Sequence, residues 1–281
     1  MSYKDVLVHL DDTEICAARV AAALALAKRD KARVTGIAMA LESTIATYIG
    51  IDFPASLTEE QEALVEASAN SAVAKFEAAA KEAGIEYKVR VIRCPATKAA
   101  ARLAFFARHA DMTFLGQADP DSAGRSYQES LLDSVLHSSG RPVYMVPYIG
   151  RFEHKTRRAV IAWDGSKKAV RAVSDAIPML KARDEVDVLV VNPEQRSDEF
   201  GGQQGENLVE HLTRYGINAK VVERTNPEVN VATVILNHIA DVGADLLVMG
   251  AFGQSRLREK TFGGVTNTIL HQMTAPVVMS E

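Results

Sequence analysis

The chain has 281 residues, 47% of them apolar, so it is long for one ordinary domain and apolar enough to build two cores. Its net charge of −4 gives no electrostatic reason to expect a DNA or RNA partner. The sequence opens without a signal-peptide pattern and has no apolar run long enough to cross a bilayer, so we expect a cytoplasmic protein without a membrane partner. Cys16 and Cys94 lie far apart and lack metal-ligand spacing, so no metal site is predicted.

The first half alternates strand patterns with helical ones. An apolar strand pattern covers residues 6–11, and the Thr-Glu-Glu-Gln at residues 58–61 has the form of a capping box that begins a long helix, which Gly84 can end. Residues 41–54 mix apolar and small side chains, and three interpretations stay open: a flap over this half, a surface for a partner, or an ordinary loop packed on its own domain. Two further strand patterns follow at residues 111–116 and 142–147.

A short polar linker that contains Pro and Gly, residues 147–156, separates the halves. We therefore predict two domains, residues 1–149 and residues 156–281. In the second half, helical periodicity covers residues 170–180 and 265–273. The strand patterns of this half are residues 159–163, 186–191, 219–223, 245–249 and 276–279.

The two halves repeat one another. Residues 111–116 match residues 245–250, and residues 134–137 match residues 268–271, at a constant offset of 134. Two copies of one fold is the economical interpretation of such a repeat.

The alternation of strands and helices predicts the α/β fold class, with a parallel sheet in each half and helices on both faces. Right-handed crossovers make such sheets doubly wound. Ligands of doubly wound sheets bind beyond the carboxyl ends of the strands, where the winding reverses. Candidate site residues are therefore expected at these ends.

A glycine-rich loop follows the fourth strand of the second half. Gly250, Gly253 and Gly263 form the pattern G-x-x-G-x9-G, which leaves a strand, makes a loop and opens a helix. Glycines at such a turn often serve only the tight turn. They also let backbone amides approach phosphate oxygens, and a helix N-terminus adds N–H donors and partial positive charge. Because Asp164 ends the first strand of the same half, the whole pattern favours an anion-binding loop.

The glycine pattern and the strand followed by Asp164-Gly-Ser resemble the nucleotide-binding signature of the universal stress protein family, whose domain would span the chain twice. The resemblance implies two five-stranded, Rossmann-like sheets of strand order 3-2-1-4-5. It implies ATP or another adenine nucleotide, with or without Mg²⁺, over the ends of strands one and four. Asp164 would contact the ribose or the adenine, and Val191 would flank the adenine. The residues implied to surround the ribose and phosphates are Gly250, Gly253, Gly263, Gly264, Val265 and Thr266.

Two positions depart from this signature or leave a role open. Gly264 stands where ATP-binding members usually have Ser or Thr, so a backbone amide remains but a hydroxyl is lost. Thr266 is either a substitute for that hydroxyl or a helix-capping residue. Trp163 either borders the ligand or packs in the core.

The matched loop of the first half has the opposite charge. The offset places Asp119 opposite Gly253 and Glu129 opposite Gly263, and the loop is net negative where that of the second half is net positive. A carboxylate roughly 5 Å from a phosphate costs about 3 kcal/mol at an effective dielectric of about 20. The first half is therefore predicted to have lost nucleotide binding.

The resulting functional hypothesis is a cytoplasmic stress-response protein that binds an adenine nucleotide in its second half for sensing or regulation, without catalysis. The alternatives are a nucleotide-free scaffold and a weak ATP hydrolase, against which the missing G-x-x-x-x-G-K-[ST] loop speaks. In the related family the last strand mediates dimerisation, so residues 142–147 and 276–279 are predicted to pair as an intramolecular pseudo-dimer, because sheet edges need a partner. Whether whole chains also form homodimers stays open.

Overall fold

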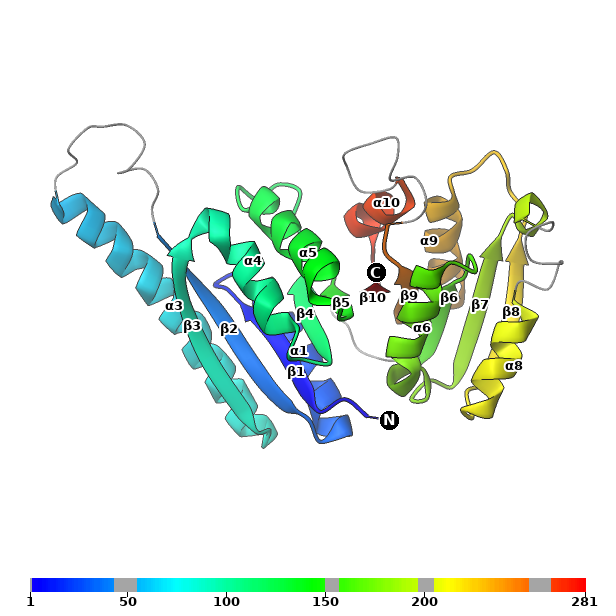
Figure 1. Cartoon of the computed structure of the whole chain (residues 1–281), viewed down its shortest axis with the longest axis horizontal. Coiled ribbons are helices and arrows are strands. Elements are labelled where there is room, and N and C mark those ends of the chain that lie inside the picture. Colours follow the sequence, from blue (N-terminus) through cyan, green and yellow to red (C-terminus); the bar gives the residue numbers. More distant parts are fainter. Residues whose placement is uncertain (1, 43–54, 150–156, 197–204, 253–263) are drawn as a thin grey trace. The chain divides into compact units, whose positions relative to one another are not determined.

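The computed structural model describes residues 2–42, 55–149, 157–196, 205–252 and 264–281. Most of the 41–54 segment, the linker residues 150–156, Gly253 and Gly263 lie outside the described residues. The chain divides into two compact units, Ser2–Arg141 and Pro142–Glu281. Each unit has a mostly parallel sheet between layers of helices, which is the predicted α/β class (Figure 1).

The first unit contains four parallel strands. They pair in the order β3, β2, β1, β4. Helices α1 and α3 pack together on the sheet, and α4 packs against α5. The bounds are β1 Asp5–Leu10, α1 Ile15–Asp30, β2 Arg33–Glu42, α3 Ala55–Ala83, β3 Tyr87–Pro95, α4 Ala96–Ala107, β4 Met112–Gly116 and α5 Arg125–Ser139.

In the second unit, five strands pair in the parallel order β8, β7, β6, β9, β10. Counted along this half of the chain, the order is 3-2-1-4-5. Helix α6 packs against β9 and β10, whereas α9 packs against β7 and against α10. The bounds are β6 Arg158–Ala162, α6 Lys167–Leu180, β7 Glu185–Val191, η1 Pro193–Arg196, α8 Glu206–Arg214, β8 Ala219–Arg224, α9 Val231–Val242, β9 Leu246–Gly250, α10 Gly264–Gln272 and β10 Val277–Ser280.

Strand β5, Val143–Val146, belongs by its contacts to the second unit. It pairs antiparallel with β10, with Tyr144 opposite Val278. All four of its residues are buried. The free edge of β10 is therefore covered by a strand that comes from the end of the first repeat.

The burial of each strand follows from its position in the sheet. The central strands β1 and β6 are buried on both faces, as expected where helices cover both sides of a parallel sheet. The outer strands β3 and β8 have more exposed residues than the central strands. Both cysteines are free and buried. No helix within the described ranges is both long and apolar enough to span a membrane.

The long helix of the first half begins earlier than its sequence signal. Helix α3 starts at Ala55, so the predicted capping box at residues 58–61 lies inside the helix. Its predicted end is confirmed, because Gly84 follows Ala83 with a φ of 66°. In that left-handed conformation a glycine avoids the steric cost of a Cβ.

Candidate functional site

The Asp-Gly-Ser segment forms a fixed turn between β6 and α6. The Asp164 carboxylate accepts a hydrogen bond from the backbone N–H of Ser166 at 3.0 Å, and Gly165 has a φ of 69°. The Ser166 hydroxyl in turn accepts from the N–H of Ala169 and caps α6. This turn holds Asp164 at the carboxyl end of the central strand.

The end of β9 is packed closely against the start of α6. A Cβ added to Gly250 would lie 2.6 Å from the backbone nitrogen of Ala169. Glycine at this position is therefore needed for packing of the strand on the helix.

The first residues of the glycine loop are held by two hydrogen bonds from their backbone N–H groups. The N–H of Ala251 donates to the carbonyl of Ser280, and the N–H of Phe252 donates to the Thr266 hydroxyl at 3.1 Å. Phe252 has a φ of 54°, a conformation that costs energy for a side chain of this size. Thr266 thus ties the loop to α10, and its role toward a ligand stays a prediction.

Lys168 is a site residue that sequence reasoning missed. Its ammonium donates to the carbonyl of Phe252 at 2.7 Å and pairs with Glu281 at 3.1 Å. It also lies 5.7 Å from the centre of the Phe252 ring. No sequence motif marked this lysine, because its partners come from the far end of the repeat.

A cavity of about 160 Å³ opens at the carboxyl ends of β6, β7 and β9. The predicted residues Asp164, Val191, Gly250, Val265 and Thr266 line it together. Trp163 also borders it, as do apolar side chains from β6, β7, β9 and α9. These additional residues are Ala162, Leu189, Val231, Ile235 and Met249.

The remaining predicted residues do not line this cavity in the described part of the chain. Gly264 is the first residue of α10, and no described atom lies within 4 Å of a Cβ added there. Gly253 and Gly263 lie outside the described residues, as do the charged residues between them. Within the described ranges, no group of three His, Cys, Asp or Glu side chains is placed to hold a metal ion.

The equivalent strand end of the first unit is chemically different. Asp11, which corresponds to Asp164, pairs with Arg19 at 2.7 Å. The Arg19 guanidinium, on a residue only 1% exposed, also donates to the carbonyl of His9 and lies where a Cβ on Gly116 would be. Burial opposes ionisation of Asp11, but the hydrogen bond to His9 and the charge of Arg19 hold its pKa well below the usual range. Asp11 is therefore a carboxylate already neutralised within the protein.

A larger cavity of about 480 Å³ lies over this end of the first unit. His9 and Tyr127 are among its lining residues. Burial lowers the pKa of His9, so that its imidazole is neutral at pH 7, and burial raises the pKa of Tyr127. The cavity thus presents neutral polar groups, the compensated carboxylate of Asp11 and the carboxylate of Asp12, which accepts a hydrogen bond from the Ser68 hydroxyl.

The two carboxylates predicted to repel phosphate have different surroundings. Asp119 accepts a hydrogen bond from the N–H of Asp121 at 3.0 Å. Glu129 lies within α5 and pairs with Arg125 at 2.8 Å, so part of its charge is compensated. Residues 125–129 form the first turn of α5, in which the N–H of Arg125 donates to the carbonyl of Ser122 and that of Gln128 to the carbonyl of Gly124.

Comparison with known proteins places the fold in a family. The family model described as the universal stress protein family matches residues 2–147 and again residues 155–280. None of the curated proteins matches the chain.

Solved structures with the same fold cover nearly the whole chain. A universal stress protein from Archaeoglobus fulgidus is 18% identical, with a TM-score of 0.70 and coverage of 99% of this chain and 96% of its own. A putative universal stress protein from Pseudomonas aeruginosa is 14% identical, with a TM-score of 0.57 and coverage of 99% and 93%. A functionally unknown protein from the same species is 13% identical, with a TM-score of 0.56 and coverage of 99% and 92%. The chain therefore belongs to the universal stress protein family and carries two copies of its domain in tandem.

Proposed function

We propose that the chain binds one adenine nucleotide, in its second unit, and acts in sensing or regulation rather than in turnover. The observation that carries the proposal is the convergence of Asp164, Val191, Gly250, Val265 and Thr266 around one cavity. The cavity lies where β6 is flanked by β7 and β9, the point at which the winding of the sheet reverses. Open α/β sheets bind their ligands at this point.

The cavity suits the base of the nucleotide. Its walls are mostly apolar, and its volume of about 160 Å³ is below the roughly 300–1,000 Å³ of pockets that enclose drug-sized ligands. Only part of a nucleotide would therefore be enclosed. In this proposal the adenine enters between Val191 and Val265, and Asp164 accepts a hydrogen bond from the base or the ribose.

The start of α10 supports binding of the phosphates. A helix N-terminus offers N–H donors and partial positive charge, and no described atom lies within 4 Å of a Cβ added to Gly264 at this end. The phosphates of ATP or another adenine nucleotide, with or without Mg²⁺, would extend from the cavity toward this end. Asp164 is the only titratable side chain among the described residues that line the cavity, which favours binding over hydrolysis.

The first unit is proposed to bind no nucleotide. The carboxylate that corresponds to Asp164 is held by the buried Arg19, and residues 125–129 already belong to α5. Asp119 and Glu129 add negative charge on the same side. This contrast within one chain predicts a stoichiometry of one.

Isothermal titration calorimetry of the intact chain with ATP, ADP and AMP tests the proposal. We expect one equivalent per chain. Asp164→Asn should weaken binding about tenfold or more, since hydrogen bonds to a charged group contribute about 1.5–3 kcal/mol. Val231→Trp should fill the cavity and abolish binding, whereas Thr97→Trp, an exposed residue that corresponds to it in the first unit, should leave affinity unchanged.

Other outcomes separate the alternatives. Two equivalents per chain would contradict the assignment of a single site. Unchanged affinity in Val231→Trp would contradict the position of that site. If no adenine nucleotide binds, the alternative of a nucleotide-free scaffold protein would remain. Multiple turnover of ATP would favour the alternative of a weak ATP hydrolase.

The intramolecular pseudo-dimer stays a proposal as well. The antiparallel pairing of β5 with β10 supports it, because the last strand of one repeat then covers the last strand of the other. Association of whole chains would be measured separately by light scattering.

A further inference from the structure

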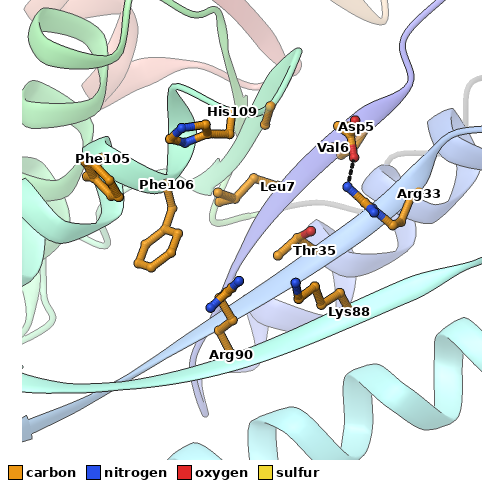
Figure 2. A pocket seen from close by; sticks show the side chains of 11 residues that line it. Asp5, Val6, Leu7, Arg33, Thr35, Lys88, Arg90, Phe105, Phe106 and His109 are labelled. Atoms are coloured by element: carbon orange, nitrogen blue, oxygen red, sulfur yellow. Dashed lines mark hydrogen bonds and ion pairs between the residues drawn. The ribbon is translucent and has the colours of Figure 1, made fainter.

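A second cavity in the first unit lies at the opposite ends of the strands. It has a volume of about 350 Å³ and is lined by the amino-terminal parts of β1, β2 and β3 and by the last residues of α4 (Figure 2). The cavity is remote from the carboxyl ends of the same strands, where proteins with open α/β sheets bind their ligands. The proposed nucleotide site does not involve it.

Two cations from β3 face this cavity. Lys88 and Arg90 alternate along the strand and therefore point to the same face of the sheet, toward α4. The Arg90 guanidinium lies 5.3 Å from the centre of the Phe106 ring. Among the ion pairs of the described residues, neither Lys88 nor Arg90 has a carboxylate partner, whereas the nearby Arg33 pairs with Asp5.

The rest of the lining contains the ion pair of Asp5 with Arg33 and the His109 side chain, together with several apolar residues. Phe106 and Leu7 line it beside the Thr35 hydroxyl, and Phe105 is 54% exposed, which is unusual for a side chain of its size. Positive charge thus lies next to uncovered aromatic surface. A ligand that satisfies both needs an anionic group and an apolar body.

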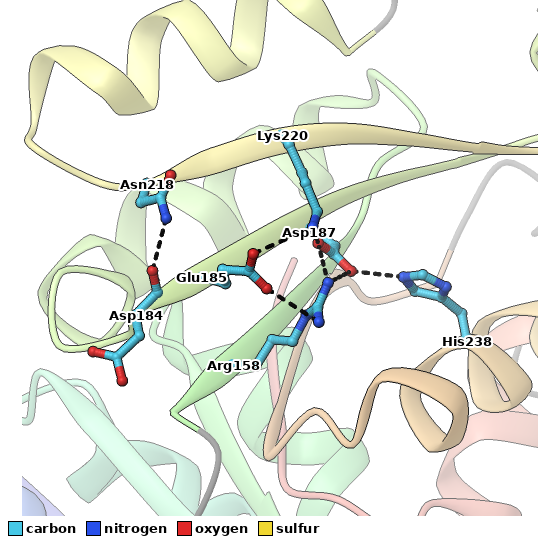
Figure 3. A network of polar contacts seen from close by, with 7 residues as sticks. All are labelled: Arg158, Asp184, Glu185, Asp187, Asn218, Lys220 and His238. Atoms are coloured by element: carbon cyan, nitrogen blue, oxygen red, sulfur yellow. Dashed lines mark hydrogen bonds and ion pairs between the residues drawn. The ribbon is translucent and has the colours of Figure 1, made fainter.

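In the second unit, the carboxylate of Asp187 lies at the position that corresponds to this cavity (Figure 3). Strand pairing matches Lys88 with Lys220 and Thr35 with Asp187. The Asp187 carboxylate is fully buried and accepts from Arg158 at 3.0 Å and from His238 at 2.9 Å. Lys220 lies 3.7 Å from it.

In the first unit the position of Asp187 has no carboxylate, and the Asp5 carboxylate that lines the cavity is paired with Arg33. Thr35 occupies the position equivalent to Asp187. At the repeat offset of 134, Ala104 occupies the position equivalent to His238. The lysine is retained, and Arg90 adds a second cation where the second unit has Val222. Of the network's cations the first unit therefore keeps only the lysine, with Asp5 and Ala104 at the positions of Arg158 and His238, and adds Arg90. Lys88 and Arg90 face a position at which no buried carboxylate stands.

We propose that this cavity binds a small organic carboxylate with an aromatic body. The carboxylate occupies the place that the Asp187 side chain holds in the second unit and accepts hydrogen bonds from Lys88, Arg90 and the Thr35 hydroxyl. Guanidinium and carboxylate match in geometry, so Arg90 favours this anion over a point charge. The ring of the ligand packs on Phe105 and Phe106.

Titration of the full chain with phenylacetate, followed by ligand-observed NMR, tests the inference. Phenylacetate should bind saturably. Its neutral isostere phenylacetamide should have an affinity at least about tenfold lower, because it cannot form the charge-assisted hydrogen bonds of the carboxylate. Lys88→Gln and Arg90→Gln should each weaken phenylacetate about tenfold. Thr35→Asp, which supplies the carboxylate of the second unit, should abolish binding.

Lys28→Gln is the matched control, because it removes the same charge from α1, which does not line the cavity. It should leave the affinity unchanged, and thermal unfolding of each variant verifies the fold. Absence of saturable binding, equal binding of phenylacetamide, or retained affinity in both β3 variants would overturn the proposal. Displacement of phenylacetate by an equal concentration of inorganic phosphate would also overturn it, since the site would then be a general anion patch.

Discussion

At the scale of single residues, the buried carboxylate of Asp187 makes the strongest stability prediction. Asp187→Ala removes the carboxylate to which Arg158 and His238 are hydrogen-bonded. Because one partner of a buried pair is lost, the free energy of unfolding should fall by about 3–5 kcal/mol. Glu185→Ala removes a carboxylate that is 43% exposed and pairs with the same arginine, so it should cost less than about 1 kcal/mol. Urea unfolding of both variants measures the difference. Equal losses would mean that the buried network does not stabilise the unit.

His9 predicts a dependence of stability on pH. Burial lowers its pKa in the folded chain below the ordinary value of 6.5. As the pH falls below 6.5, the unfolded chain takes up a proton that the folded chain excludes, so the free energy of unfolding decreases. Asp11 acts at lower pH: its stabilising contribution is present above 3.8 and is lost as the pH falls through its depressed pKa.

His9→Gln should therefore flatten the fall in unfolding free energy between pH 6.5 and about pH 5. The exposed His211→Gln is the control and should retain that slope. Urea unfolding at several pH values gives the measurement. A slope that persists in His9→Gln would assign the pH dependence to other groups.

Gly264 gives a prediction about affinity. Nothing described lies within 4 Å of a Cβ there, so Gly264→Ser can restore a hydroxyl at the start of α10 without a clash. One added hydrogen bond to a phosphate should tighten adenine nucleotide binding about two- to tenfold. Gly264→Ala separates this effect from the backbone effect of removing a glycine, and calorimetry should find the serine variant tighter than the alanine variant.

At the scale of elements, the sequence predicted the second unit well because its strands are short apolar runs between helices of clear periodicity. The predicted strand at residues 186–191 is β7, Glu185–Val191, and the one at residues 219–223 is β8, Ala219–Arg224. The start of α3 was predicted less well. Its first residues form an additional helical turn before the capping box, because a local capping signal competes with continuation of the helix.

The candidate site was predictable only where local sequence determines position. Asp164 and Gly250 end strands, so the fold itself brings them to one edge of the sheet. The role of Lys168 depends on Glu281, which is distant in the chain. The role of Arg19 depends on its burial against the carbonyl of His9, which the packing of other elements determines. Thr266 makes a contact that neither of its two predicted roles included, since its partner Phe252 belongs to the loop before the helix.

Strand β5 yields a prediction at this scale. A fragment of residues 142–281 keeps β5 on the edge of β10, whereas a fragment of residues 156–281 leaves that edge uncovered. Exposed strand edges promote pairing between chains. The shorter fragment should therefore self-associate and the longer one should stay monomeric in light scattering. Two monomeric fragments would mean that β10 does not need β5 as a cover.

At the scale of the whole molecule, the two units should respond differently to nucleotide. Hydrogen exchange measured by mass spectrometry with and without ATP should show protection at the Asp164 turn and at the end of β9, because the proposed ligand contacts only the second unit. Residues 2–141 should exchange at the same rates in both conditions. Protection at Asp11 and Gly116 would instead indicate a second nucleotide site.

The matched ion pairs at the start of each sheet bear on how the two copies have diverged. Asp5 pairs with Arg33 in the first unit, and at the same positions of the second unit Arg158 pairs with Glu185. The attraction is preserved although both signs are exchanged, so the copies have changed at coupled sites. A chimaera that carries β6 in place of β1 would set Arg158 against Arg33. Recombination between the two repeats should therefore cost less stability, by up to about 1 kcal/mol at this pair, when neighbouring strands are exchanged together.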